Sequence, residues 1–262
     1  MIEAVFERAK RAGRAALIPY VMAGDPSLQT TALVLRALTD AGADLIELGV
    51  PYGDPLADGP TIAAAGQRAL GAGTALPDVL ALVREAAAGG CAPIVLFSYF
   101  NPVYRFGIER FARELAAVGA AGAIVPDVAL EETGELRAAL ASAGVAMPLL
   151  VAPSTPPERA ARIAAAASGF VYVVSRLGVT GAGAAPAFGP VRAQLAALRA
   201  LTGKPLAVGF GVSRSEHVRE IAGAADGVIV GSALIDAYAG LDGAAAAAAA
   251  GSFAQALMNG PS

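Results

Sequence analysis

The chain has 262 residues, which is enough for one large α/β domain, and 56% of them are hydrophobic while only 16% are charged. Alanine supplies much of the hydrophobic excess, and no apolar run reaches the roughly 18 residues of a transmembrane helix, so we expect no membrane span. A net charge of −3 and a pI near 5.3 argue against a nucleic-acid-binding surface. The single cysteine, Cys91, excludes an internal disulfide and fits a reducing compartment.

The N-terminal segment can be interpreted in two ways. Basic residues between positions 8 and 14 precede the apolar stretch AALIPYVMAG, an order that resembles a secretory signal peptide. Against this, the segment 2–12 has the pattern of an amphipathic helix and contains Glu3 and Glu7, and Pro19 interrupts the apolar stretch. We therefore expect an N-terminal helix at about 2–12 and a cytoplasmic protein.

Short apolar runs recur along the chain, separated by Ala-, Leu- and Arg-rich segments with helical periodicity. The runs are continuous rather than alternating, as is typical of parallel strands buried on both faces. The predicted strands cover residues 16–22, 44–49, 93–97, 123–126, 148–151, 170–174, 205–209 and 227–230. Strands that alternate with helices in this number, over about 250 residues, predict an α/β protein with the (β/α)₈ TIM-barrel fold.

A doubly wound open sheet is the alternative arrangement. That fold would place a glycine-rich fingerprint after the first strand, and the sequence there, LIPYVMAGDPS, has none. The alanine run at 244–250 is expected to form part of an outer helix at about 243–258. Because no linker interrupts the pattern, we expect a single domain.

Two glycine clusters follow the last two predicted strands. Gly211 ends the GFG motif, and Gly231 precedes Ser232. In TIM barrels the loops after strands 7 and 8 often bind phosphate, because bare backbone N–H groups can approach the anion closely. A tight turn at each position is the simpler interpretation, but glycines at both expected loops favour a phosphate site. The glycine-rich segment 175–183 is predicted to be a lid.

Several kinds of chemistry are excluded by what the chain lacks. Lys10 lies in the N-terminal helix and Lys204 precedes a strand, so neither is placed for a Schiff base at the carboxyl ends of the strands. The single histidine, His217, is expected in the first turn of a helix, most simply as a surface residue. One His and one Cys cannot supply a zinc site, and no Ser–His–Asp arrangement fits. An oxygen-only magnesium site is left open.

Carboxylates remain as the candidate reactive groups. Glu47 lies between Ile46 and Leu48 in a buried strand, and no predicted strand contains an arginine that could pair with it. Burial should raise its pKa and suit it to proton transfer near neutral pH. Asp58 is either a second functional carboxylate or an ordinary Asx turn before a glycine, and Asp54 more simply belongs to a turn.

The segment PYGDPLADGP (51–60) resembles the loop signature of the tryptophan synthase alpha chain family. The resemblance continues through YVMAGDP, PIVLFSYFNPVYRFGIERF, IVPDVALEE, FVYVVSRLGVTG, VGFGVS and IVGSALI, and so covers essentially the whole chain. It implies a lyase of tryptophan biosynthesis, which cleaves indole-3-glycerol phosphate to indole and glyceraldehyde 3-phosphate by a retro-aldol reaction. No metal or organic cofactor would take part.

Carried over by position, the resemblance also implies roles for individual residues. Glu47 would be the catalytic acid–base, and Asp58 would bind the indole N–H and stabilise positive charge on the ring. Tyr172 would lie beside Glu47. Apolar walls would come from Tyr20, Phe97 and Phe210, the closing loop would contain Thr180 and Gly181, and the phosphate would be bound at Gly181, Gly211, Gly231 and Ser232.

The family further implies a partner. Its members dock on a beta chain that carries pyridoxal phosphate, in an alpha–beta–beta–alpha heterotetramer, and indole passes between the active sites. Asn101–Pro102 and the loop at 51–60 resemble the contact surfaces. Two departures concern loop dynamics: Gly53 replaces the usual serine, and Met22 stands where a small or hydroxyl residue is frequent.

Two other functions stay open on the sequence. The first is another phosphate-binding barrel enzyme of the same pathway, such as an isomerase or indole-glycerol phosphate synthase. The synthase would need lysines at the strand ends, and this chain has none there. A catalytically silent barrel that binds a phosphate ligand and activates a partner is the other. The presence of Glu47 and Asp58 argues against the silent barrel.

Overall fold

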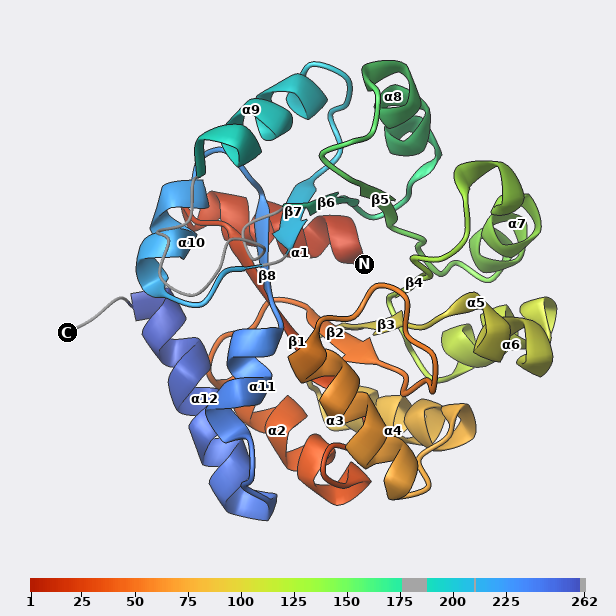
Figure 1. Ribbon diagram of the computed structural model, residues 1–262, viewed down its shortest axis with the longest axis vertical. Coiled ribbons are helices and arrows are strands. Elements are labelled where there is room, and N and C mark those ends of the chain that lie inside the picture. Colours follow the sequence, from red (N-terminus) through yellow and green to blue (C-terminus); the bar gives the residue numbers. More distant parts are fainter. Residues whose placement is uncertain (176–187, 210, 260–262) are drawn as a thin grey trace.

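The computed structural model describes residues 1–175, 188–209 and 211–259. Within them, parallel strands form one eight-stranded sheet that curves into a barrel, with helices around it (Figure 1). The strands are β1 (Ala16–Met22), β2 (Ile46–Gly49), β3 (Ile94–Phe97), β4 (Gly122–Ile124), β5 (Leu149–Val151), β6 (Val171–Val174), β7 (Leu206–Gly209) and β8 (Gly227–Val230). The predicted (β/α)₈ barrel is confirmed.

The hydrogen-bonded strand order is β4-β3-β2-β1-β8-β7-β6-β5, so the barrel is joined continuously everywhere except between β4 and β5. There an isolated bridge pairs Gly122 with Ala146. The N–H of Ala123 donates to the carbonyl of Ala146 at 2.9 Å, and the N–H of Ala146 donates to the carbonyl of Ala121 at 3.2 Å. This seam, made by residues 121–123 and 146, nearly closes the barrel.

The predicted strand boundaries are correct at β1 and β8 and differ slightly elsewhere. The largest correction concerns the strand predicted at 123–126, which runs over Gly122–Ile124. Pro126 has no N–H to donate to a ladder, and the Gly122 backbone packs closely against the Ala146 carbonyl. Backbone pairing therefore starts one residue earlier and ends two residues earlier than the apolar run suggests.

Most of the helices surround the barrel, and α1 lies across one end of it (Figure 1). They are α1 (Ile2–Arg11), α2 (Leu28–Asp40), α3 (Pro60–Gly71), α4 (Leu76–Ala88), α5 (Phe100–Phe106), α6 (Ile108–Ala117), the 3₁₀ turn η1 (Leu130–Glu132), α7 (Gly134–Ser142), α8 (Pro157–Ala166), α9 (Phe188–Arg199), α10 (Ser215–Ile221), α11 (Ser232–Tyr238) and α12 (Gly243–Asn259). Helix α12 packs against α2 and α11. Among the described residues, we find no helix with the length and apolar character to cross a membrane.

Helix α1 covers the end of the barrel where the strands begin. Its buried face includes Ile2 and Phe6, and the Phe6 ring lies 5.6 Å from that of Phe170, just before β6. Lys204 lies at the same end, where its Nζ donates to the carbonyls of Ala164 and Ala165 at the end of α8. Its predicted position, away from the carboxyl ends of the strands, is confirmed.

An ion pair with a buried carboxylate ties the loop after β1 to α3. Asp25 is only 2% exposed, and Arg68 donates to its two carboxylate oxygens from Nε at 2.7 Å and from Nη2 at 2.8 Å. This two-bond geometry fixes the guanidinium against the carboxylate. Since α3 begins at Pro60, two residues after Asp58, the pair anchors one end of the loop that carries Asp58.

Candidate active site

A cavity of about 310 Å³ opens at the carboxyl ends of the strands. The structure brings together eight of the eleven predicted site residues in its lining: Tyr20, Glu47, Asp58, Phe97, Tyr172, Gly211, Gly231 and Ser232. The other three, Thr180, Gly181 and Phe210, lie outside the described residues. Ile62, Val212, Ser213, Ile229, Ala233 and Asp236 complete the lining and were not predicted.

Glu47 occupies the centre of β2 and points into the barrel. In a strand, neighbouring side chains face opposite sides, so Ile46 and Leu48 face the surrounding helices while Glu47 faces the cavity. The side chain is 2% exposed, and its Oε2 has no hydrogen-bond partner among the described residues. Burial, with a smaller contribution from the charge of Asp58, raises the pKa of Glu47 to about 8. The carboxyl group therefore holds a proton at neutral pH.

Asp58 lies in the loop after β2, half-buried at the edge of the cavity. The hydroxyl of Tyr99 donates a 2.8 Å hydrogen bond to its Oδ1. Burial raises the pKa of Asp58, and the Tyr99 hydrogen bond opposes this rise. The two carboxyl groups thus differ in environment: Glu47 is desolvated with an unsatisfied oxygen, whereas Asp58 is hydrogen-bonded at the rim.

Tyr99 holds Asp58 in place, and the sequence analysis missed this residue. It follows β3 and is buried, and besides holding Asp58 it accepts the N–H of Ala57 at 3.0 Å. Its ring packs against those of Phe97 and Tyr52. The signal in the sequence was a tyrosine at the carboxyl end of a predicted strand, within FSYFNP, where barrel active sites gather.

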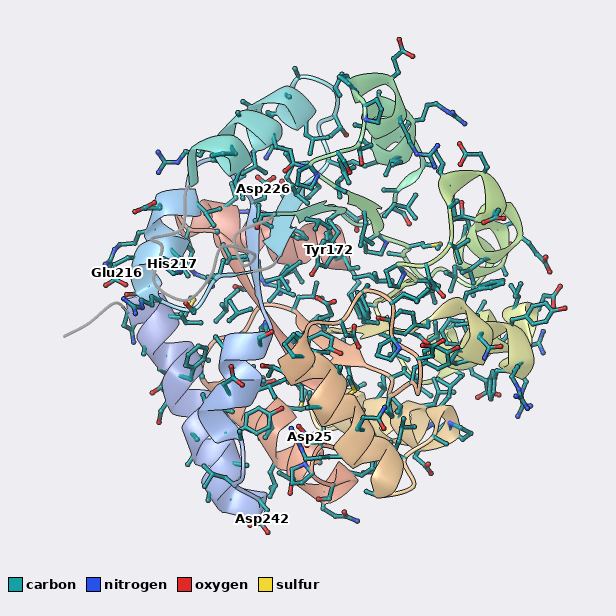
Figure 2. The ribbon with its side chains drawn as sticks, in the orientation of Figure 1. Asp25, Tyr172, Glu216, His217, Asp226 and Asp242 are labelled. Carbon is teal, nitrogen blue, oxygen red and sulfur yellow. The ribbon has the colours of Figure 1, made fainter. Side chains whose placement is uncertain are left out.

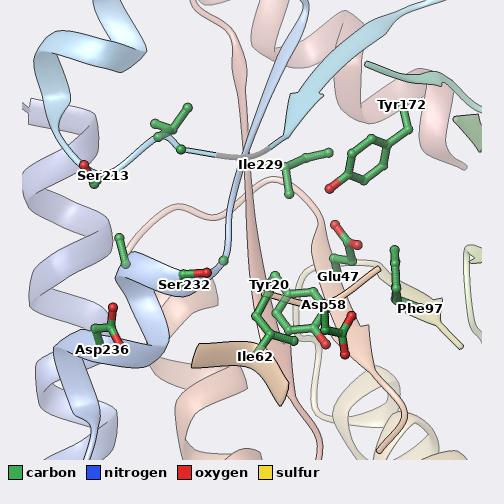
Figure 3. Close-up of a pocket in the computed structure, with 14 residues that line it drawn as sticks. Tyr20, Glu47, Asp58, Ile62, Phe97, Tyr172, Ser213, Ile229, Ser232 and Asp236 are labelled. Atoms are coloured by element: carbon green, nitrogen blue, oxygen red, sulfur yellow. The ribbon is translucent and has the colours of Figure 1, made fainter. Parts of the chain in front are cut away.

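Tyr20 and Tyr172 are buried close to Glu47, and in Figure 3 they flank it from opposite sides, with the Tyr172 hydroxyl directed toward the carboxyl group. Burial raises the pKa of Tyr172 well above its usual range, and the charge of Glu47 adds to the rise. Glycines make room for both rings. A Cβ atom at Gly49 would overlap the Tyr20 hydroxyl, and one at Gly209 would overlap the Tyr172 hydroxyl.

The other end of the cavity is formed by the loops after β7 and β8. Figure 3 shows Ser213, Ser232 and Asp236 there, across the cavity from Glu47 and Asp58. Gly211 has φ = 90°, a backbone conformation that favours glycine. The small residues leave backbone and hydroxyl groups accessible to an anion, whereas the carboxylate of Asp236 adds a negative charge at the same end.

The two departures from the family pattern lie outside the cavity lining. Met22 is buried, and its Cε lies near the position of a Cβ on Gly66 of α3, so it packs outward from the strand. Gly53 is exposed, and a side chain added there would meet no atom within 4 Å.

In residues 1–175, 188–209 and 211–259, we find no group of three His, Cys, Asp or Glu side chains that could hold a metal ion.

The site combines a protonated carboxyl group, a hydrogen-bonded carboxylate, aromatic walls and a glycine-rich rim. Such a cavity can transfer protons to and from an aromatic substrate that carries an anionic group. Comparisons with known proteins agree with this chemistry. The family described as "Tryptophan synthase alpha chain" matches residues 6–258.

Relatives of the same name are similar over most of their lengths. The tryptophan synthase alpha chain of Synechocystis is 51% identical over 235 residues, which are 89% of each chain, and that of Prochlorococcus marinus is 46% identical over 98% of this chain and 94% of its own. A tryptophan synthase structure from Mycobacterium tuberculosis, 39% identical, covers 98% of this chain and 96% of its own with a TM-score of 0.89. For the alpha subunit from Legionella pneumophila, 33% identical, the coverages are also 98% and 96% and the TM-score is 0.88. The chain belongs to the tryptophan synthase alpha chain family.

Proposed function

We propose that this protein cleaves indole-3-glycerol phosphate to indole and glyceraldehyde 3-phosphate, with Glu47 as the proton-transferring group and Asp58 as the ring-binding carboxylate. The observation that carries the proposal is the position of Glu47. Its carboxyl group is buried, has a pKa of about 8, and has an unpartnered oxygen in a cavity that also contains Asp58. A protonated acid of this kind can donate a proton near neutral pH.

The reaction divides between the two carboxyl groups. Protonated Glu47 donates its proton to C3 of the indole ring, and positive charge develops on the ring nitrogen. The Asp58 carboxylate accepts the indole N–H and stabilises that charge. Loss of the side-chain hydroxyl proton, with Glu47 now able to act as base, turns the adjacent carbon into the aldehyde of glyceraldehyde 3-phosphate. The carbon–carbon bond to C3 breaks, and its electrons restore the aromatic indole.

The rest of the cavity suits the same substrate. Tyr20, Phe97 and Tyr172 give the indole ring an apolar slot beside Glu47. Gly211, Gly231 and Ser232 offer the phosphate backbone and hydroxyl donors at the opposite end, and their convergence in one cavity supports that assignment. Three further roles rest on the family resemblance alone. We assign Phe210 as a wall of the indole slot, Thr180 as part of the closing loop, and Gly181 as a phosphate contact.

We also propose that the protein works in the cytoplasm without a cofactor of its own, docked on a tryptophan synthase beta chain that holds pyridoxal phosphate. The loop after β2 and α5 would form the contact. In support, each of the two elements exposes a large hydrophobic side chain: Leu56 in that loop is 78% exposed and Tyr104 on α5 is 65% exposed. Asn101–Pro102 lies in the same helix. Without the partner we expect weak activity.

The deciding experiment measures indole release from indole-3-glycerol phosphate by the purified protein, alone and with a beta chain. The Glu47→Gln variant should lose activity in both cases while it still binds inorganic phosphate. A protein that releases no indole under either condition, yet activates the beta chain, would instead be the silent barrel. Turnover by Glu47→Gln at the wild-type rate would remove Glu47 from its assigned role.

The phosphate end is tested separately. A Gly211→Asp substitution places a carboxylate at the rim and an L residue at a positive φ, so the KM should rise at least tenfold. Gly223→Asp is the matched control, since Gly223 has φ = 87° and no atoms within 4 Å of an added Cβ. Equal KM values for the two variants would argue against phosphate binding at Gly211.

A further inference from the structure

His217, the single histidine of the chain, contacts the loop that forms one wall of the cavity. It is the third residue of α10, is half-buried, and is labelled beside that helix in Figure 2. The backbone N–H of Ser213 donates to its Nδ1 at 3.3 Å, and its ring also interacts with the backbone of Gly211. A histidine expected to be an ordinary surface residue thus contacts both ends of the 211–213 segment.

The same three residues, Gly211, Val212 and Ser213, line the cavity at the end assigned to phosphate. The segment contains a positive φ at Gly211, so its shape depends on contacts that select this conformation from the many open to glycine. A planar ring that accepts the Ser213 N–H and lies against the Gly211 backbone supplies such a contact. An anion-binding loop that is already shaped loses less conformational entropy when the ligand binds.

We propose that His217 is a positioning residue, which holds the 211–213 loop in its phosphate-binding shape without touching the substrate. This inference rests on the proposed function, because that function assigns phosphate to this loop. It adds a residue from outside the cavity lining to the determinants of substrate affinity.

The competing explanation is a helix cap. A side chain at the third helical position often accepts the N–H of the N-cap residue and stabilises only the helix. The N-cap of α10 is Arg214, but His217 accepts the N–H of Ser213, one residue earlier and within the cavity wall. A cap would change stability alone, whereas a positioning residue would change affinity for phosphate.

The test uses the full-length protein and three variants. His217→Leu keeps the bulk of the side chain but cannot accept a hydrogen bond, His217→Gln keeps an acceptor, and Glu216→Ala alters the same exposed helical turn without contacting the loop. The dissociation constant for inorganic phosphate is measured by calorimetry. The KM and kcat for indole-3-glycerol phosphate are measured with a beta chain present, and thermal melting verifies folding.

For His217→Leu we expect the phosphate dissociation constant and the KM to rise about five- to tenfold, with kcat within twofold of wild type. His217→Gln should recover most of the affinity, and Glu216→Ala should bind like wild type. Unchanged affinity in a folded His217→Leu protein would overturn the inference, as would equal losses in the Leu and Gln variants. If Leu prevents folding, wild-type affinity in His217→Ala overturns it and weaker affinity supports it. A wild-type protein that binds no phosphate would instead refute the phosphate site itself.

Discussion

The hydroxyl of Tyr99 donates to Asp58 at 2.8 Å and accepts the N–H of Ala57 at 3.0 Å. One phenol group at the end of β3 therefore holds two consecutive residues of the loop after β2. The loop is otherwise rich in glycine and proline and largely exposed, so this contact determines where the Asp58 carboxylate lies relative to Glu47.

Replacing Tyr99 by Phe should lower kcat/KM for indole-3-glycerol phosphate about tenfold, because a hydrogen bond to a charged group is lost. That bond also lowers the pKa of Asp58, so its loss should raise this pKa and move the acid limb of the pH–rate profile to higher pH. Steady-state kinetics between pH 5 and 9, without a beta chain, would measure both effects. Tyr104→Phe, at an exposed tyrosine on α5, is the control. If the acid limb of the pH–rate profile stays at the same pH in Tyr99→Phe, the Tyr99 hydrogen bond does not lower the pKa of Asp58.

Glu47 should make the protein less stable as the pH rises. The pKa of its carboxyl group increases from 4.5 to about 8 on folding, so between these values the folded chain holds a proton that the unfolded chain has released. The stabilisation from this bound proton is fully present below pH 4.5 and is lost progressively up to about pH 8. The whole loss is on the order of 5 kcal/mol.

The Glu47→Gln variant cannot ionise at this position, so it should lose less stability than wild type between pH 5 and pH 8.5. Urea unfolding at both values would measure the difference. Glu7→Gln, at an exposed position on α1, should follow the wild-type curve. If wild type and Glu47→Gln lose the same amount of stability between the two pH values, folding does not raise the pKa of Glu47.

Gly209→Ala should displace Tyr172 from its place beside Glu47, because the new Cβ and the Tyr172 hydroxyl would occupy the same space. We expect kcat/KM to fall about tenfold or more and the free energy of unfolding to fall by about 1–3 kcal/mol, as for other overpacked cores. Gly203→Ala, where an added Cβ meets nothing within 4 Å, controls for the loss of a glycine. Wild-type kinetics in Gly209→Ala would show that activity does not depend on this position of Tyr172.

Arg68→Gln should leave the buried carboxylate of Asp25 without its countercharge. Removing one partner of a buried ion pair costs about 3–5 kcal/mol, and we expect about 2–3 kcal/mol here because the Arg68 side chain is 46% exposed. Chemical denaturation would measure the loss. Arg84→Gln on α4, whose exposed arginine forms no ion pair among the described residues, should have little effect. An equally small effect at Arg68 would show that water replaces the guanidinium.

The fold was predictable because buried parallel strands leave continuous apolar runs in the sequence. The runs at 16–22 and 227–230 coincide with β1 and β8. The prediction at β4 was less accurate because Val125 and Pro126 are as apolar as the strand before them. Where pairing stops there depends on backbone contacts with Ala146, which is distant in sequence.

Within the site, Glu47 was predictable because a lone acid in a buried strand without a cation is costly unless it has a function. Tyr99 was not, because its role depends on the two loops after β2 and β3 meeting in space. His217 was missed for the same reason. Its position in the helix was recognisable, but its contact with Ser213 requires the geometry of the turn that precedes α10.

The barrel consists of two runs of four strands, β4 to β1 and β8 to β5, which pair at the β1–β8 junction and meet again at the seam between β4 and β5. The two runs contribute different parts of the cavity. Glu47, Asp58 and the ring of Phe97 come from the first half of the chain, whereas Gly211, Gly231 and Ser232 come from the second. A substrate that reaches both groups would bridge the two halves across the β1–β8 junction. It would act as a non-covalent cross-link, and its binding should protect the amides of residues 121–123 and 146 from hydrogen exchange, although they lie outside the cavity.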